Sequence, residues 1–247
     1  MFEERESLRQ QLHQELNQIG IDADERQEDL LLRHLDLVVE MNKHMNLTRI
    51  TDPESAVTLH VVDSLTLLPS FLESQKKTHL PYLDLGTGAG FPGIPLAIMS
   101  QSQGLLIDST QKKIAAVSDF LVKLVLDDRI EADAVRAEEL ALTNKRQFGT
   151  VVARAVAPLS VLIEYASPLL CRHGSLVVSK GQLSDEEYDD SLYAAELCGM
   201  DAVSRETIEL PHDMGHRELL VYIRERNPQI KLPRRAGMAQ HHPLTRK

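Results

Sequence analysis

One segment near the middle of the chain constrains the fold more than any other. Residues 82–97 read Tyr-Leu-Asp-Leu-Gly-Thr-Gly-Ala-Gly-Phe-Pro-Gly-Ile-Pro-Leu-Ala: a short apolar run, three glycines within five residues, and a helical pattern. Gly86, Gly88 and Gly90 permit positive φ and a close approach of the backbone to a ligand. The helix that follows presents unpaired N–H groups at its start. The segment therefore predicts a strand–turn–helix unit that binds a ligand, in preference to a plain tight turn.

Two glycine patterns fit this turn. Residues 88–93 satisfy the dinucleotide pattern GxGxxG, and residues 84–90 satisfy DxGxGxG, the nucleoside loop of S-adenosylmethionine (AdoMet) methyltransferases. The dinucleotide pattern begins three residues after the strand ends and carries Pro92 inside the turn, whereas Gly86 follows the strand directly. We therefore favour AdoMet, with Asp84 holding the loop and the cationic amino-acid end of the cofactor. A short glycine motif is weak evidence by itself, so a nicotinamide dinucleotide stays an alternative that calorimetry tests.

Short apolar runs alternate with helical stretches after residue 80, which predicts a parallel sheet with helices on both faces. Two last apolar runs have little helix between them and predict an antiparallel hairpin at one edge. The expected strands are 82–85, 105–108, 130–135, 150–153, 175–179, 202–210 and 218–224, and the expected helices are 94–100, 111–126, 158–171 and 185–198.

The first third of the chain is predicted to be helical. Apolar residues recur at helical spacing through 3–72, with a third helix that begins at Pro53 and ends near Pro69. Residues 73–79 are polar and are expected to form a connection. We therefore divide the chain into a helical segment packed on the core (1–79), an α/β domain (80–226) and a basic tail (227–247).

Charge is distributed unevenly along the chain. The formal net charge is −10, yet residues 224–247 carry seven bases against one acid, a local charge of +6, which leaves −16 on the rest. The negative charge of most of the protein repels the phosphates of nucleic acid. The basic tail is the one region whose charge would attract them. We expect the tail and the rim of the pocket to form an RNA face. Deletion of 228–247 would then weaken RNA binding and leave AdoMet affinity unchanged.

The cysteines and the lengths of the apolar runs bear on whether the protein binds zinc or spans a membrane. Cys171 and Cys198 lie 27 residues apart and belong to no CxxC or Cys/His cluster, so no zinc site is expected. With no signal peptide and no stretch of about 20 apolar residues, we expect a cytoplasmic protein that spans no membrane. Composition, 43% hydrophobic and 26% charged, is typical of globular proteins and excludes disordered and fibrous classes.

A second acidic residue fits a nucleoside site. Asp108 lies 22 residues after Gly86, at the end of the next apolar run. An acid at this place in a doubly wound sheet accepts hydrogen bonds from a ribose diol. It equally suits a cap for the following helix, and the sequence leaves the two roles open.

Several stretches, in order across about 46–237, together resemble the GidB (RsmG) family of 16S rRNA guanine-N7 methyltransferases. They are Asn46-Leu-Thr-Arg-Ile, His60-Val-Val-Asp-Ser-Leu, the loop from Asp84 to Ala97, Leu106-Ile-Asp-Ser-x-x-Lys-Lys, Arg136-Ala-Glu, Ala153-Arg-Ala-Val-Ala, Ser179-Lys-Gly and Leu232-Pro-Arg-Arg-x-Gly. The combination is far more specific than any one motif. The acidic first 25 residues and the last ten lie outside it.

The resemblance implies a Rossmann-like class I methyltransferase that moves a methyl group from AdoMet to N7 of one guanine in the 530 loop of 16S rRNA. Its partner would be that RNA or the small ribosomal subunit. By carry-over, Gly86 and Phe91 line the AdoMet pocket, Ala137 and Glu138 flank the adenine at the end of the third strand, and Arg154 lies at the pocket mouth. Nothing in the resemblance calls for a metal, and we expect a monomer.

Guanine N7 carries a lone pair and no proton, so its methylation needs no general base. We therefore name no catalytic residue and expect positioning and electrostatics to dominate. Cations are the candidates for substrate contact: Arg49, Arg154, Lys180, Arg217 and the tail arginines. Arg154 and Lys180 are the stronger ones, because both end predicted strands at the cofactor edge of the sheet, whereas Arg49 and Arg217 equally fit solvated surface charges. We assign Lys180 and Arg217 to the substrate. His60 and Asp63 share one helical face, and we expect them to serve packing or hydrogen bonding between the helical segment and the domain.

Two other functions remain open from the sequence. The first is an AdoMet methyltransferase that acts on a small molecule or a protein, with the helical segment as a lid over the substrate. The second is a ribosome-associated nucleotide-binding protein without enzymatic activity. Titration with AdoMet separates the second from any methyltransferase, and mass analysis of rRNA from cells that lack the protein tests the first.

Overall fold

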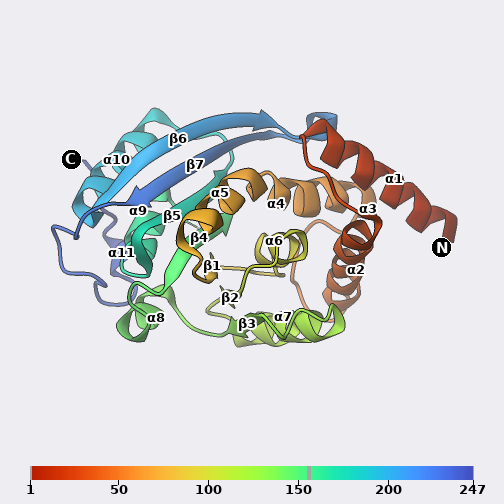
Figure 1. Ribbon diagram of the computed structural model, residues 1–247, viewed down its shortest axis with the longest axis horizontal. Helices are drawn as coiled ribbons and strands as arrows, with labels where there is room; N and C mark the ends of the chain where they lie inside the picture. Colours follow the sequence, from red (N-terminus) through yellow and green to blue (C-terminus); the bar gives the residue numbers. More distant parts are fainter. Residues whose placement is uncertain (1, 155–156, 247) are drawn as a thin grey trace.

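The alternation after residue 80 forms a single seven-stranded sheet in the computed structural model, which describes residues 2–154 and 157–246 (Figure 1). The strands are β1 (Tyr82–Leu85), β2 (Gly104–Ile107), β3 (Ile130–Asp133), β4 (Phe148–Arg154), β5 (Leu170–Lys180), β6 (Met200–Glu209) and β7 (His216–Arg224). Their order is β3-β2-β1-β4-β5-β7-β6; β1 to β5 pair in parallel, and β7 is antiparallel to both neighbours. The predicted fold class is confirmed, including the antiparallel edge hairpin.

Helices cover both faces of this sheet. They are α1 (Phe2–Gln18), α2 (Glu25–Asn42), α3 (Pro53–Ala56), the π-helical segment η1 (Val57–Val62), α4 (Asp63–Leu65), α5 (Leu68–Thr78), α6 (Gly93–Met99), α7 (Gln111–Lys123), α8 (Ala137–Thr143), α9 (Leu159–Ala166), α10 (Asp185–Cys198), the short 3-10 turn η2 (Pro211–Asp213) and α11 (Met238–His241). The residues Ala155 and Val156 of the matching stretch Ala153-Arg-Ala-Val-Ala lie outside the described residues, as do both end residues of the chain.

Successive side chains of the central strands enter two different hydrophobic clusters, because they alternate between the faces of the sheet. Tyr82 and Val152 join the cluster under α1 to α7, and Leu83 and Val151 join the cluster under α8 to α10. All four are fully buried. Burial of both faces explains why these strands read as continuous apolar runs in the sequence.

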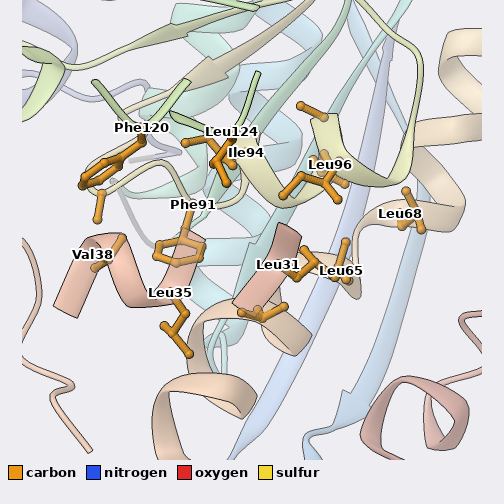
Figure 2. Packing of buried hydrophobic residues seen from close by; sticks show 14 of the residues in the cluster. Leu31, Leu35, Val38, Leu65, Leu68, Phe91, Ile94, Leu96, Phe120 and Leu124 are labelled. Atoms are coloured by element: carbon orange, nitrogen blue, oxygen red, sulfur yellow. The ribbon is translucent and has the colours of Figure 1, made fainter. Parts of the chain in front are cut away.

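The N-terminal helices share the first of these cores. Figure 2 shows Leu35 and Val38 of α2 next to Phe91, with Ile94 of α6 and Phe120 of α7 in the same cluster. Each large side chain buried here contributes about 1.5–3 kcal/mol of hydrophobic free energy. The helical segment therefore completes the core on the face that carries the glycine loop.

Several predicted boundaries are wrong for local reasons. The expected polar connection 73–79 continues α5, because Pro69 lies in the first turn of that helix, where proline is tolerated, and does not end a helix. The expected helix 158–171 ends at Ala166, and Leu170 already pairs with Phe148 in the sheet. The third strand ends at Asp133, and the unpredicted helix α8 follows it.

The helical run Pro53–Thr78 is long and apolar enough to cross a membrane by length and composition alone. However, 72% of its qualifying window is buried inside the protein. Its apolar side chains, among them Val61, Leu65 and Phe71, belong to the first hydrophobic cluster. The run is therefore a core helix, and its π-helical turn brings His60 to the edge of the sheet where β1 and β4 end.

Candidate functional site

The glycine loop between β1 and α6 is built on left-handed backbone. Gly86, Gly88 and Gly90 have φ values of 73°, 60° and 95°, a backbone conformation that residues with a Cβ atom rarely adopt. The N–H groups of Gly86 and Thr87 both donate to the carbonyl oxygen of Ile107 at the end of β2, at 2.8 and 2.9 Å. This pairing ties the loop to the carboxyl edge of the sheet, which is where ligands bind in folds of this kind.

Asp84, on strand β1, fixes the end of the glycine loop by a hydrogen bond. Its Oδ2 accepts a hydrogen bond from the Gly93 N–H at 2.9 Å, and its Oδ1 has no partner among the described residues. The side chain is fully buried, and desolvation raises the pKa of Asp84 to about 7. Asp84 lines neither of the cavities described next, so its observed contact is with the loop and not with the space where a cofactor's amino-acid end would lie.

Two cavities meet at this edge of the sheet, and Gly86 lines both. The first, of about 470 Å³, is lined by Leu47, Thr48, Ile50, Leu59, His60, Asp63, Gly86, Thr87, Gly88, Ala89, Phe91, Arg154, Ser179, Lys180, Gly181 and Arg217. The second, of about 140 Å³, is lined by Leu85, Gly86, Ile107, Asp108, Ser109, Val135, Arg136, Ala137, Glu138, Leu162, Tyr165 and Gln240. We call them the cation cavity and the nucleoside cavity.

The nucleoside cavity contains the residues that the sequence placed around a ribose and an adenine. Asp108 lines it, and its Oδ1 accepts the Thr110 N–H at 2.9 Å. Thr110 is the N-cap residue of α7, and no side chain of the described residues caps this helix, so Asp108 does not have the cap role that the sequence left open. Ala137 and Glu138 also line it. They lie in the first turn of α8 and not at the end of the third strand, which corrects the expected placement.

A buried carboxylate organises the cation cavity. Asp63 accepts hydrogen bonds from Arg154 Nη1 at 3.0 Å and from Arg217 Nε at 2.9 Å. Arg154 also donates to the Leu59 carbonyl at 2.8 Å, and its guanidinium lies 5.5 Å from the centroid of the Phe91 ring. Burial lowers the pKa of Arg154, and the nearby Asp63 carboxylate opposes that effect.

Two histidines lie against the ring of Phe91. The His60 ring stacks on Phe91 at 4.7 Å between centroids and 11° between planes, and His34 lies at 4.5 Å. Burial, with Arg154 nearby, lowers the pKa of His60 to about 3, and burial lowers the pKa of His34 to about 4. Both imidazoles are therefore neutral near pH 7. His60 Nε2 hydrogen-bonds with Thr48 Oγ1 at 2.8 Å, within the helical segment. The expected contact between this segment and the domain is made by the stack of His60 on Phe91 and by the hydrogen bonds of Asp63 with Arg154 and Arg217.

The candidate substrate cations differ in their placement. Lys180 lines the cation cavity, and its Nζ lies 3.0 Å from both the Ala157 carbonyl and Glu187 Oε1. Arg217 lines the same cavity. Arg49 is exposed and lines neither cavity. The structure thus brings Arg154, Lys180 and Arg217 together and leaves Arg49 outside.

Sequence reasoning missed two hydroxyl groups in the wall of the cation cavity. Thr48 bonds to His60, and Ser179 Oγ is buried without a hydrogen-bond partner among the described residues. Both lie inside stretches that carried the family resemblance, which was the available signal. The part of the chain that the structure describes contains no group of three or more His, Cys, Asp or Glu side chains able to hold a metal ion.

The basic tail is not a free cationic arm. Arg224 is 4% exposed, Arg226 pairs with Asp201 at 2.9 Å, and Arg234 Nε donates to the buried Glu164 at 2.7 Å. Three of the seven bases of residues 224–247 therefore serve the folded protein, and one of them, Arg234, lies within the tail 227–247. The expectation that this tail forms the RNA face is weakened accordingly.

The sequence of the chain is similar to a known family of methyltransferases. Residues 27–215 match the family model GidB, described as rRNA small subunit methyltransferase G. The chain belongs to the GidB family. It is similar to the GidB-family protein "Ribosomal RNA small subunit methyltransferase G" of Lactobacillus acidophilus, with 34% identity over 93% of this chain and 96% of that one. The protein of the same name from Deinococcus radiodurans is 38% identical over 96% and 92%.

Solved structures with the same fold are more distant from this GidB-family chain. A putative sarcosine dimethylglycine methyltransferase from Galdieria sulphuraria has a TM-score of 0.54 at 9% identity, over 70% of this chain and 88% of that one. The antibiotic-resistance methyltransferase Kmr has a TM-score of 0.51 at 16% identity, over 64% and 93%. At such identities the similarity shows the fold alone, a class I methyltransferase sheet.

Proposed function

We propose that the protein transfers the methyl group of AdoMet to N7 of a guanine in the 530 loop of 16S rRNA. The observation that carries this proposal is the junction of the two cavities at Gly86, which gives a nucleoside and a target base adjoining sites on the carboxyl edge of the sheet. The names of the relatives, which are rRNA small-subunit methyltransferases, support the class of substrate.

The residues present fit the cofactor. Asp108 offers a carboxylate to a ribose diol, and Ala137 and Glu138 bound the same cavity. The backbone at Gly88 is open to a ligand, because a Cβ built there meets only the Gly86 carbonyl oxygen, at 3.9 Å. When bound, AdoMet supplies an electrophilic methyl group on a sulfonium. Gly86, between the two cavities, lies where the two substrates would meet.

The side chains of the cation cavity bind and orient, and none of them acts as a base. His60 is neutral and is held by its stack on Phe91, and both oxygens of Asp63 accept from arginines. Guanine N7 has no proton to remove, so no base is required. Lys180 and Arg217 offer donors to phosphate oxygens or to the guanine O6.

Access to N7 restricts the RNA that the cavity accepts. The major groove of an A-form helix is too deep and narrow for side chains to reach N7. The target guanine therefore lies in a loop or is flipped out of its stack into the cation cavity. A protein with a net charge of −10 repels phosphate except near such a local cluster of cations, so binding is expected to be sensitive to salt.

The deciding experiment incubates purified protein with methyl-labelled AdoMet and small ribosomal subunits, and then locates the label by mass analysis of RNA fragments. We expect one N7-methylguanine in the 530 loop. Label on another nucleotide, or on ribosomal protein, would refute the assigned target. Naked 16S rRNA in parallel reveals whether the RNA alone or the assembled subunit is the substrate. A small-molecule substrate is the alternative if both RNA samples stay unlabelled while AdoMet binds.

A matched pair of variants tests the cation cavity. Lys180→Met is expected to weaken RNA binding and to reduce the slope of log affinity against log salt by about 0.7–0.9 if Lys180 holds one phosphate. Lys145→Met changes an exposed lysine between α8 and the amino end of β4, away from both cavities, and is expected to leave the slope unchanged. Equal slopes for the two variants would remove Lys180 from the RNA contact.

A further inference from the structure

The end of the chain forms part of the wall of the nucleoside cavity. Gln240 of α11 lines this cavity together with Ala137 and Glu138 of α8 and Tyr165 of α9. Helix α11 packs beside α9, on the face of the sheet opposite the N-terminal helices (Figure 1). A segment that the sequence assigned to RNA binding thus lies against the proposed cofactor site.

Two anchors hold this segment in place. The Gly237 N–H donates to Glu138 Oε1 at 2.8 Å, and Arg234 Nε donates to Glu164 Oε1 at 2.7 Å. Arg234 Nη2 also donates to the His242 carbonyl at 2.9 Å, which closes residues 234–242 into a compact turn. Glu164 is 3% exposed, and such a desolvated, charge-assisted pair resists separation.

Burial confirms that this segment is docked. Ala239, next to Gln240, is fully buried, and Leu232 and Leu244 on either side of the segment pack against the second hydrophobic cluster. The segment therefore occupies a defined position. We call residues 234–242 the C-terminal strap.

We propose that the C-terminal strap is a structural part of the AdoMet site, where it closes the nucleoside half and presents Gln240 to the adenosine. This inference rests on the proposed function. Its strongest support is Glu138, because the carboxylate that bounds the nucleoside cavity is the one that holds the Gly237 N–H. A nucleoside that enters this cavity meets Glu138 and the strap together.

The chemistry of Gln240 suits such a ligand. Its carboxamide carries both donors and an acceptor, and an adenine edge likewise presents an amino donor beside a ring-nitrogen acceptor. The inference reverses the expectation that loss of 228–247 leaves AdoMet affinity unchanged. It also gives the basic tail a role other than RNA binding, in which the charge of Arg234 anchors the strap to Glu164.

The test is calorimetric titration of the full chain and its variants with two ligands, AdoMet and 5′-methylthioadenosine, which lacks the amino-acid half. Gln240→Ala removes one hydrogen-bonding group from the wall, and we expect about fivefold weaker binding. A chain that ends at residue 236 loses the Glu138 contact and the whole strap helix, and we expect at least a tenfold loss. Both losses should be equal for the two ligands, because the strap faces only the nucleoside half.

Two controls separate a binding effect from unfolding. His241→Ala changes the next residue of α11, which is exposed and does not line the cavity, and is expected to stay within twofold of the full chain. Thermal unfolding of every variant identifies any loss of fold. If the truncated chain does not fold, Gln240→Ala against His241→Ala decides the question.

The outcomes distinguish this inference from the proposed function. If the full chain binds neither ligand, both proposals fail. If the full chain binds AdoMet, and Gln240→Ala or the folded truncated chain binds it equally well, the inference about the strap is overturned and the proposed function stands. Weaker binding of AdoMet with unchanged binding of methylthioadenosine would also overturn it, because the effect would then lie in the amino-acid half.

Discussion

Replacement of Asp63 by asparagine is the perturbation that most directly tests how the cation cavity is built. Asp63 is 4% exposed and accepts from Arg154 of β4 and from Arg217 of β7. One carboxylate therefore joins helix α4 to the two strands that bound the cavity. Asp63→Asn keeps the shape of the side chain, removes its charge, and turns an amide donor toward one of two guanidinium groups that also donate.

The expected magnitude follows from the two contacts. A hydrogen bond to a charged group contributes about 1.5–3 kcal/mol, and the amide oxygen of asparagine replaces at most one of the two, in weaker form. Arg154 then remains buried without a full counter-charge, and removal of one member of a buried pair costs about 3–5 kcal/mol. Because Arg217 is partly exposed, we expect the lower end, about 3 kcal/mol of unfolding free energy, or roughly 6–12 °C in melting temperature.

Urea unfolding and calorimetry at pH 7 measure this change. The matched control is Asp201→Asn, which removes an equivalent carboxylate from its exposed pair with Arg226 and is expected to cost less than about 1 kcal/mol. In an Arg217→Met background the effect of Asp63→Asn should be smaller, since one of its two partners is already gone. An Asp63→Asn protein that unfolds at the wild-type midpoint, or no earlier than the Asp201→Asn control, would refute the reasoning.

Three further predictions follow from the loop and the stacked rings. Burial raises the pKa of Asp84 from 3.8 to about 7, so the folded protein binds this proton more tightly than the unfolded chain does. The contribution of Asp84 to the free energy of unfolding therefore falls as pH rises from about 4 to 7. The urea midpoint of Asp84→Asn should accordingly rise relative to that of the wild type between about pH 5 and pH 8. Gly90→Ala should destabilise the protein and abolish AdoMet binding, because at φ +95° the new Cβ would lie 2.6 Å from an Ile94 side-chain carbon. The control is Gly20→Ala, where φ is +74° and the new Cβ meets nothing within 4 Å. It should show only the cost of strained backbone, about 1–2 kcal/mol. His60→Gln should lower kcat by less than about tenfold and leave the pH–rate profile above pH 5 unchanged, because His60 is already neutral there.

Each of these has an outcome that contradicts it. An unchanged difference between Asp84→Asn and wild type across that pH range would mean that the carboxyl group titrates normally. Equal AdoMet affinity of Gly90→Ala and Gly20→Ala would show that the close packing under the loop is unimportant. A loss of 100-fold or more in kcat for His60→Gln, with the disappearance of one limb of the pH profile, is the behaviour of a general base and would contradict the proposed chemistry.

The central strands and the last helix of the core were predictable because their signals are local. Strand Tyr82–Leu85 and helix Asp185–Cys198 have the predicted bounds. The boundary between α9 and β5 was not predictable, since the apolar run through Leu169 and Leu170 suits a helix and a strand equally. Pairing of Leu170 with Phe148 of the neighbouring strand decides it, and that contact lies outside any short window of sequence.

In the candidate site, too, local motifs were predictable and contacts between distant residues were not. The glycine loop and Asp108 were visible as motifs, because the backbone conformation that they serve extends over a few residues. Asp63 meets Arg154 across 91 positions and Arg217 across 154 positions of the chain, and nothing in the charge pattern selects these partners from the others. Family resemblance pointed to the stretches that contain them, but not to the contacts.

What the sequence determined by itself was the order of most strands and helices along the chain and the glycine turn at Gly86, since both follow from residue periodicity and local backbone preference. The family was indicated by the resemblance of its motifs. Only the tertiary structure decided that Glu138 binds Gly237 from 99 residues away, and that Arg234 of the basic tail pairs with the buried Glu164. The reason is physical: the energy of a charge depends on its distance from other charges and from water, and both distances exist only after the chain has folded.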